Sequence, residues 1–232
     1  MLIIGHRGAA GLAPENTIDA FKKGLDVGAD ILEFDVQLTR DGVPVVIHDS
    51  TLFRTHRKPR IVRWSGHASL QKATEKGHKV ATLEEVLNLC FGKVLLNLEV
   101  KNRGTGAKIA RYIQENYIKK DSDWENILFS SFKGLELRAI RRVSPHAELA
   151  MLHNRNPFAF MAYHRQLQFT AVGFHRLYIN PLATEVAKKL DLFIYAYTVN
   201  RPAAAKRLAI EGIEGFVTDD PARLRAELSD LV

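Results

Sequence analysis

Eight short apolar runs alternate with amphipathic helical patterns along the whole chain, and this alternation restricts the fold more than any other feature. Strands that alternate with helices build parallel sheets, because each helix carries the chain back across one face of the sheet. Eight such units predict an α/β fold, a (β/α)₈ TIM-type barrel forming a single domain over residues 1–232. The runs lie at residues 2–5, 30–38, 93–100, 126–131, 147–152, 170–174, 191–199 and 215–219.

An open, doubly wound sheet is the second choice of architecture. Such sheets commonly bind dinucleotides through a G-x-G-x-x-G turn after the first strand. The corresponding segment here is GHRGAAG, which lacks that spacing. The barrel is therefore favoured.

Two segments depart from simple alternation. Asp41 and Gly42 form a turn signal that predicts a hairpin after the second apolar run. Residues 50–81 then show no clear period, and we expect them to form a small irregular insertion over the C-terminal mouth of the barrel. Further helix starts are marked by a cap at Asn16 or Thr17 and by a capping-box pattern at Thr82.

Two carboxylates interrupt the second apolar run, DILEFDVQLT. Alternate side chains of a strand share a face, so Glu33 and Asp35 point one way while their apolar neighbours point the other. In a barrel the apolar set packs under the helices, and the acids face the barrel axis. The run KVLLNLEVK repeats this pattern and directs Glu99 inward. Three acids from two strands are thus expected near one mouth.

Such acids repel one another when they are left alone. Two unit charges ~4 Å apart at an effective dielectric constant of ~20 interact by about 4 kcal/mol. Oxygen ligands from Glu33, Asp35 and Glu99 suit one divalent cation of the hard type, Mg²⁺ or Ca²⁺. The alternative from the residues alone is a salt-bridge network with Lys101 or Arg7. A zinc site is disfavoured, because no His/Cys set has the required spacing.

Two histidines end apolar runs at the same predicted mouth. His6 closes LIIGHRG, and His48 closes VPVVIHD. A pair of this kind beside a phosphodiester can supply proton transfer, which typically contributes ~10²–10⁴-fold in rate. Arg7, next to His6, carries a forked donor group that matches phosphate oxygens.

Several ordered motifs resemble the signature of the glycerophosphodiester phosphodiesterase family. They span residues 6 to 221 and are HRGAAGLAPENTIDAF, GADILEFDVQLTRDGVPVVIHD, TLEEVL, LNLEVK, SSF, YTVN and GFVTDDP. The resemblance implies a TIM-type barrel and a metal-dependent phosphodiesterase. It also implies cleavage of small glycerophosphodiesters, of the glycerophosphocholine or glycerophosphoethanolamine type, to sn-glycerol 3-phosphate and an alcohol.

The resemblance implies roles for individual positions. The catalytic acid/base pair falls on His6 and His48, with His48 as our choice for the proton donor to the leaving alcohol. The metal ligands fall on Glu33, Asp35 and Glu99.

Further positions are carried over from the same motifs. Phosphate binding falls on Arg7 and Lys101, and support of the first loop falls on Glu15 and Asn16. Tyr197 stands where the family usually has tryptophan, so this substrate-binding position predicts a different pocket shape. The family's continuation after the H-D block is replaced here by RTHRKPR, which leaves the alcohol preference open.

Charge and composition set expectations about partners and location. The net charge is +7, and the densest basic run is Arg54 to Arg63. We interpret this run as a solvated loop or a rim that attracts phosphate-bearing substrates. No nucleic-acid partner and no stable membrane insertion are expected. Cys90 is the only cysteine and the first residues show no signal-peptide pattern, so a cytoplasmic location is expected. The sequence leaves open whether the protein is a monomer or a dimer.

Three rival functions share the barrel. A lysophospholipase D or sphingomyelinase D-like enzyme would use the same site and should show an apolar groove or an exposed aromatic loop. A phosphoinositide lyase is disfavoured by the E-x-D pair. A non-catalytic phosphate-binding barrel would normally have lost acids or histidines, and none is lost here.

Overall fold

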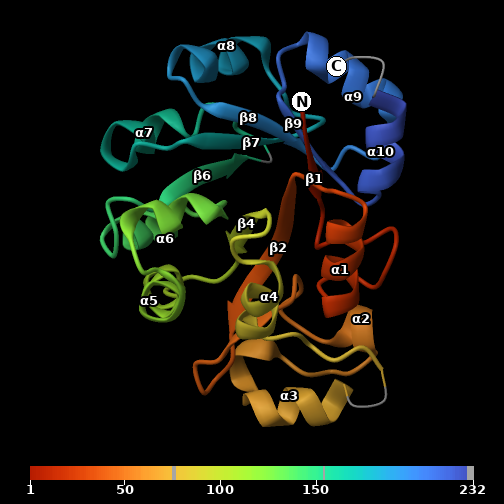
Figure 1. Cartoon of the computed structure of the whole chain (residues 1–232). Coiled ribbons are helices and arrows are strands. Elements are labelled where there is room, and N and C mark those ends of the chain that lie inside the picture. The colour runs from red at the N-terminus through yellow and green to blue at the C-terminus, as the bar shows by residue number, and fades with distance from the viewer. Residues whose placement is uncertain (75–76, 154, 229–232) are drawn as a thin grey trace.

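The structure, a computed structural model, describes residues 1–74, 77–153 and 155–228 (Figure 1). Within these residues, eight parallel strands close into a barrel, in the spatial order β1-β9-β8-β7-β6-β5-β4-β2, and β1 pairs with β2. The predicted barrel is confirmed, and each strand lies within two residues of its predicted bounds. The strands are β1 (Leu2–Gly5), β2 (Ile31–Leu38), β4 (Leu95–Val100), β5 (Ile127–Ser131), β6 (Glu148–His153), β7 (Ala171–His175), β8 (Phe193–Tyr197) and β9 (Gly215–Thr218).

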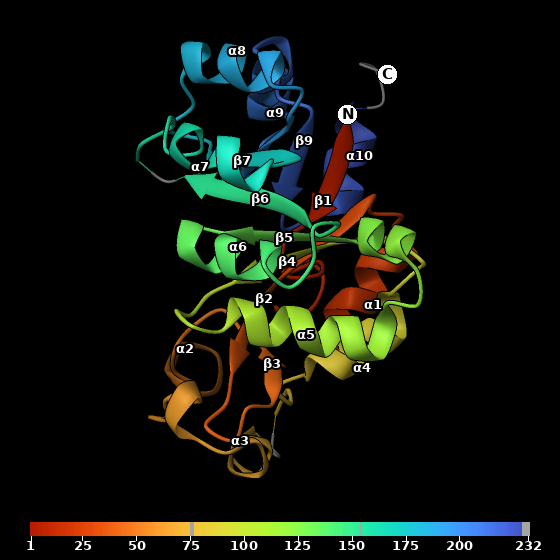
Figure 2. The same cartoon turned by 90° about the vertical axis from the view of Figure 1, so that its left-hand side faces the viewer.

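Helices cover the outside of this barrel (Figures 1 and 2). Both predicted helix starts are present: the Thr17 hydroxyl accepts from the Ala20 amide, and Thr82 forms a capping box with Glu85. The outer helices are α1 (Ile18–Asp26), α4 (Leu83–Cys90), α5 (Gly106–Tyr117), α6 (Gly134–Arg141), α7 (Met161–Leu167), α8 (Pro181–Lys189), α9 (Pro202–Ile210) and α10 (Pro221–Leu228). No helix in the described part of the chain is long and apolar enough to span a membrane.

Strand parity divides the core into two layers, as predicted. Leu32, Phe34 and Val36 lie in the large outer cluster between the strands and the helices. Ile31 belongs to a small inner cluster, which also includes Tyr195 from β8. Full burial of each large apolar side chain contributes roughly 1.5–3 kcal/mol. This energy fixes which face of β2 points inward, because a one-residue slip would turn the whole apolar set toward the barrel axis.

The predicted hairpin follows β2. Gly42 has φ of 83° at the turn, and β3 (Pro44–Val46) pairs antiparallel with β2. Beyond β3 lies the insertion, residues 50–81, which we call the lobe. It contains short helices rather than purely irregular chain: α2 (Phe53–His56), η1 (Val62–Trp64) and α3 (His67–Thr74). A small apolar core joins it to the hairpin, because this cluster includes Val45 and Ile47 together with lobe residues, and the lobe lies at one end of the barrel (Figure 1).

Candidate active site

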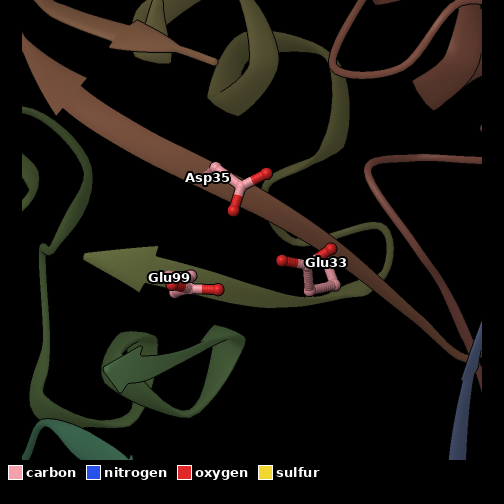
Figure 3. Close-up of side chains that lie close together, drawn as sticks. All are labelled: Glu33, Asp35 and Glu99. Atoms are coloured by element: carbon pink, nitrogen blue, oxygen red, sulfur yellow. The ribbon is translucent and has the colours of Figure 1, made fainter. Parts of the chain in front are cut away.

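The three predicted metal-binding acids converge. In the pairing of β2 with β4, Glu33 lies opposite Asn97, and Asp35 lies opposite Glu99. All three acids are buried, and each offers an oxygen within 4.8 Å of the others (Figure 3). The parallel register therefore brings together carboxylates that are far apart in sequence.

Burial makes this cluster electrostatically unfavourable. Burial and the charge of Asp35 raise the pKa of Glu33 to about 7. Burial and the charge of Asp35 also raise the pKa of Glu99, although Lys101 opposes the shift. Burial acts to raise the pKa of Asp35 as well, but Lys101, His48 and Arg7 outweigh it, and the net shift is downward.

Two cationic side chains neutralise part of this charge. Lys101 Nζ lies 2.8 Å from Glu99 Oε1 and 3.3 Å from Asp35 Oδ1, and Arg7 Nε lies 3.6 Å from Asp35 Oδ2. Glu33 forms no ion pair with a described residue; it accepts the backbone N–H of Arg7 at 2.9 Å. The salt-bridge alternative therefore accounts for two of the acids and leaves the third without a cation.

The residues present fit a hard divalent cation. Three carboxylates supply the oxygen donors that Mg²⁺ and Ca²⁺ prefer, and such ions complete their shells with water or substrate oxygens. A cavity of about 40 Å³ adjoins Glu33 and Glu99. Asn97 Oδ1 lines it, buried and without a hydrogen-bond partner among the described residues. The acidic cluster is thus a candidate metal site beside a small polar space.

His6 follows β1 and is held by a carboxylate from the opposite end of the chain. Its Nδ1 lies 2.5 Å from Asp219 Oδ1. Asn200 fixes Asp219 in turn, because its Nδ2 donates to Asp219 Oδ2 and its Oδ1 accepts the Asp219 amide. Burial acts to lower the pKa of His6, but the Asp219 hydrogen bond and the charge of Glu33 outweigh it and raise the pKa.

His48 follows β3 and is held in the same manner. Its Nδ1 lies 2.7 Å from Asp49 Oδ1, and Asp49 Oδ2 accepts from Arg54 Nε at 2.6 Å. Burial lowers the pKa of His48 more than Asp35 and Asp49 raise it, so its pKa is lowered. Each histidine thus has Nδ1 bound to an aspartate, while its pKa shifts in the opposite direction from that of the other.

Hydrogen bonds hold the loop after β1 against the lobe and the acidic cluster. Arg7 and Asn16 have left-handed backbone conformations, with φ of 51° and 58°. Glu15 accepts from the Arg7 guanidinium at 2.7 Å and from Arg54 of the lobe at 2.5 and 2.7 Å. Asn16 Nδ2 donates to Asp35 Oδ2 at 2.9 Å. Glu15 and Asn16 therefore connect the loop to the lobe and to the acidic cluster.

Tyr197, at the end of β8, lies beside the acids but has its hydroxyl occupied. Its ring lines the same cavity as Glu33 and Glu99, and its O–H donates to the His153 carbonyl at 2.5 Å. The ring packs edge-on against Phe132 and His175, at centroid distances of 6.0 and 5.9 Å. Tyr197 thus presents an aromatic surface to the site rather than a hydroxyl donor.

Four residues around the site were not given individual roles in the sequence analysis: Asp219, Asn200, Asp49 and Arg54. Asp219 lies within GFVTDDP, directly after β9, and Asp49 directly follows His48. Their positions in the sequence could have identified them, because polar residues at the C-terminal ends of barrel strands commonly belong to the active site. Arg54 had no such signal, since it lies in the aperiodic lobe.

Comparisons with known proteins agree with this architecture. The family model described as "Glycerophosphoryl diester phosphodiesterase family" matches residues 6–223. A glycerophosphodiester phosphodiesterase from Caldanaerobacter subterraneus subsp. tengcongensis is 35% identical over 237 residues, which cover 96% of each chain.

Solved structures extend the likeness to three dimensions. A glycerophosphodiester phosphodiesterase from Thermotoga maritima is 25% identical, with a TM-score of 0.82 over 97% of each chain. An Oleispira antarctica phosphodiesterase, in complex with the product sn-glycerol-3-phosphate, has a TM-score of 0.88. That likeness covers 99% of this chain and 97% of the other at 24% identity, and it concerns the fold.

Proposed function

The chain belongs to the glycerophosphodiester phosphodiesterase family of phosphoric diester hydrolases, and on this basis we propose that it hydrolyses glycerophosphocholine- or glycerophosphoethanolamine-type substrates. The products are sn-glycerol 3-phosphate and an alcohol. The observation that carries the proposal is a buried acidic triad near two histidines, each bound to its own aspartate. The Oleispira relative, which holds sn-glycerol-3-phosphate as its product, supports this choice. We further propose that residues 1–232 act as a single barrel domain.

The acids and cations divide the work of binding the phosphate. Glu33, Asp35 and Glu99 would hold one Mg²⁺ or Ca²⁺, and the bound cation would offset the charge that builds on the phosphate oxygens. Arg7 and Lys101 supply further donors to these oxygens. Both are held close to Asp35 by ion pairs, so they are positioned before substrate arrives.

The two histidines carry the protons. Each has Nδ1 engaged by an aspartate, which leaves Nε2 to exchange a proton with substrate. One histidine takes the proton of the nucleophile, either water or the C2 hydroxyl of the substrate glycerol, and the other protonates the leaving alcohol. For the protein side chains alone, the pKa directions favour His6 as the proton donor and His48 as the base. This assignment is the reverse of our sequence-based choice.

Asp219→Asn is expected to lower kcat roughly 10–100-fold, as is typical when a partner that orients a catalytic group is lost. It should also shift the pH profile, because the lost carboxylate favoured protonated His6. Removal of this carboxylate lowers the pKa of His6. If His6 is the proton donor, the alkaline limb of the pH profile therefore moves to lower pH.

The profile of kcat against pH checks this, with Asp49→Asn as the matched variant on His48. A shift of the acidic limb in Asp219→Asn would instead identify His6 as the base and restore His48 as the proton donor. If neither the acidic nor the alkaline limb of the pH profile moved in either variant, the aspartates would not act on the reaction through the pKa of the histidines.

A substrate panel tests the proposed function. Glycerophosphocholine, glycerophosphoethanolamine and a lysophospholipid are incubated with the protein in Mg²⁺, Ca²⁺ or chelator, and sn-glycerol 3-phosphate release is measured. We expect release from the first two substrates with a divalent cation and none with chelator. No release under any of these conditions would reject the proposal. Trapping a cyclic glycerol phosphate would identify the C2 hydroxyl as the nucleophile.

One observation favours a second candidate, a lysophospholipase D-like activity at the same site. The aromatic contacts of Tyr197 continue outward, because His175 packs against Tyr178 with ring centroids 5.4 Å apart. Tyr178 and Leu177 are both exposed beyond β7. This is the exposed aromatic loop that an acyl-chain substrate would use. Lysophosphatidic acid release from the lysophospholipid in the panel, faster than cleavage of glycerophosphocholine, would establish it.

A further inference from the structure

The lobe carries the entire net charge of the chain. Residues 50–81 contain four arginines, four lysines and one glutamate, so their formal charge is +7, equal to that of the whole protein. The other residues contain 25 cationic and 25 anionic side chains. The barrel is therefore neutral overall, and the excess charge lies on one projection at the end of β2 and β3 (Figure 1).

Most of these cations face solvent without a counter-charge. Arg54 is the exception, bound to Glu15 and Asp49. Six further lobe cations lie in the described part of the chain, and none of them forms an ion pair with a described carboxylate; these exposed residues are Arg57, Lys58, Arg60, Arg63, Lys72 and Lys79. Like charges crowded on a small unit repel one another and destabilise it. An anionic partner would relieve that repulsion.

Two large aromatic side chains accompany the charge. Phe53 is 68% exposed and Trp64 is 60% exposed, and both belong to short helices of the lobe. The Arg63 guanidinium lies 5.0 Å from the centre of the Trp64 ring. Tryptophan beside lysine and arginine is the composition that settles at the headgroup level of a bilayer, with the ring among the upper acyl carbons and the cations on the phosphates.

We propose that the lobe docks the protein peripherally on the surface of an anionic phospholipid bilayer. Nucleic acid is disfavoured as the partner, because no recognised nucleic-acid-binding motif accompanies the basic run. The contacts of Arg54 with Glu15 and Asp49 join the lobe to the two loops that carry His6 and His48. Docking would therefore hold the mouth of the barrel near lipid. This last step alone rests on the proposed function, and the test below measures no activity.

The two tryptophans of the chain make the docking directly observable. Trp64 is exposed, whereas Trp124 is 2% exposed in the barrel core. Addition of phosphatidylcholine vesicles containing phosphatidylglycerol should shift Trp64 emission to shorter wavelength, and pure phosphatidylcholine should not. A Trp64→Phe variant keeps only Trp124 and should lose the shift. No shift on anionic vesicles, or an equal shift in Trp64→Phe, would overturn the proposal.

Charge removal supplies the second measurement. A Lys58→Gln, Arg63→Gln, Lys72→Gln variant should bind anionic vesicles on the order of a hundredfold more weakly, since each cation near such a surface contributes a factor of about five. The matched control, Lys22→Gln, Arg111→Gln, Arg223→Gln, removes three exposed cations outside the lobe. Equal weakening in both variants would reject a lobe-specific surface. Binding of the unaltered protein to duplex DNA or RNA but not to anionic vesicles would assign the lobe to nucleic acid instead.

Discussion

An Asp35→Ala variant is expected to lose at least ~10³-fold in phosphodiesterase activity, together with its dependence on divalent cations. Asp35 is the centre of the acidic cluster: it lies opposite Glu99, accepts from Asn16 and pairs with Lys101. Its removal takes away one ligand and also frees Lys101 to pair with Glu99 alone. The affinity of the remaining two acids for a divalent cation should therefore fall.

Activity and bound metal per chain are measured together for Asp35→Ala, with Mg²⁺, Ca²⁺ or chelator. Asp35→Asn is the matched variant, because it preserves size and can still bond to Asn16 while removing the charge. A melting curve shows whether each variant is folded; because Lys101, Arg7 and Asn16 favour the charged form of Asp35, its loss is expected to lower the melting temperature. Full activity of Asp35→Ala in chelator would refute the metal assignment.

His6→Ala and His48→Ala are each expected to lose at least ~10²-fold in kcat while remaining folded and able to bind the cation. The loss follows from removing the proton donor or the proton acceptor, since neither histidine is needed to fill the acidic cluster. His175→Ala is the control, because His175 also ends a barrel strand but has no carboxylate partner among the described residues.

Rates and metal content separate the two kinds of residue. Histidine variants should keep their metal and lose turnover, whereas Asp35→Ala should lose both. Near-normal rates in both histidine variants would remove the acid/base assignment. A loss of equal size in His175→Ala would show that the aromatic wall, rather than proton transfer, limits the reaction.

The barrel could be predicted because each of its strands is recognisable from a short stretch of sequence. Each strand is a short apolar run between turn or cap signals, and period-two alternation in β2 and β4 established which side chains face inward. The acidic cluster followed from that alternation, since parallel strands of one barrel end at the same mouth. Glu33, Asp35 and Glu99 needed no knowledge of the exact register to be placed together.

The partners of the histidines were harder to predict because they depend on long-range contacts. Asp219 reaches His6 across 213 positions of sequence. Nothing in the local pattern distinguishes it from the neighbouring Asp220. Arg54 lies in a segment without periodicity, so neither its direction nor its two carboxylate partners could be inferred. Opposite pKa shifts of the two histidines likewise follow from burial and neighbouring charge, which spacing in the sequence does not contain.

Arg54 has a consequence for how this protein can diverge. Its guanidinium bonds to Glu15 in one loop and to Asp49 in another, and Glu15 also holds Arg7. A descendant that exchanged the lobe for an unrelated segment would leave both carboxylates without this cation and would loosen the groups beside them. Positions 15, 49 and 54 are therefore expected to be inherited as a set, so a new lobe can be accepted only if it brings a cation to the same place.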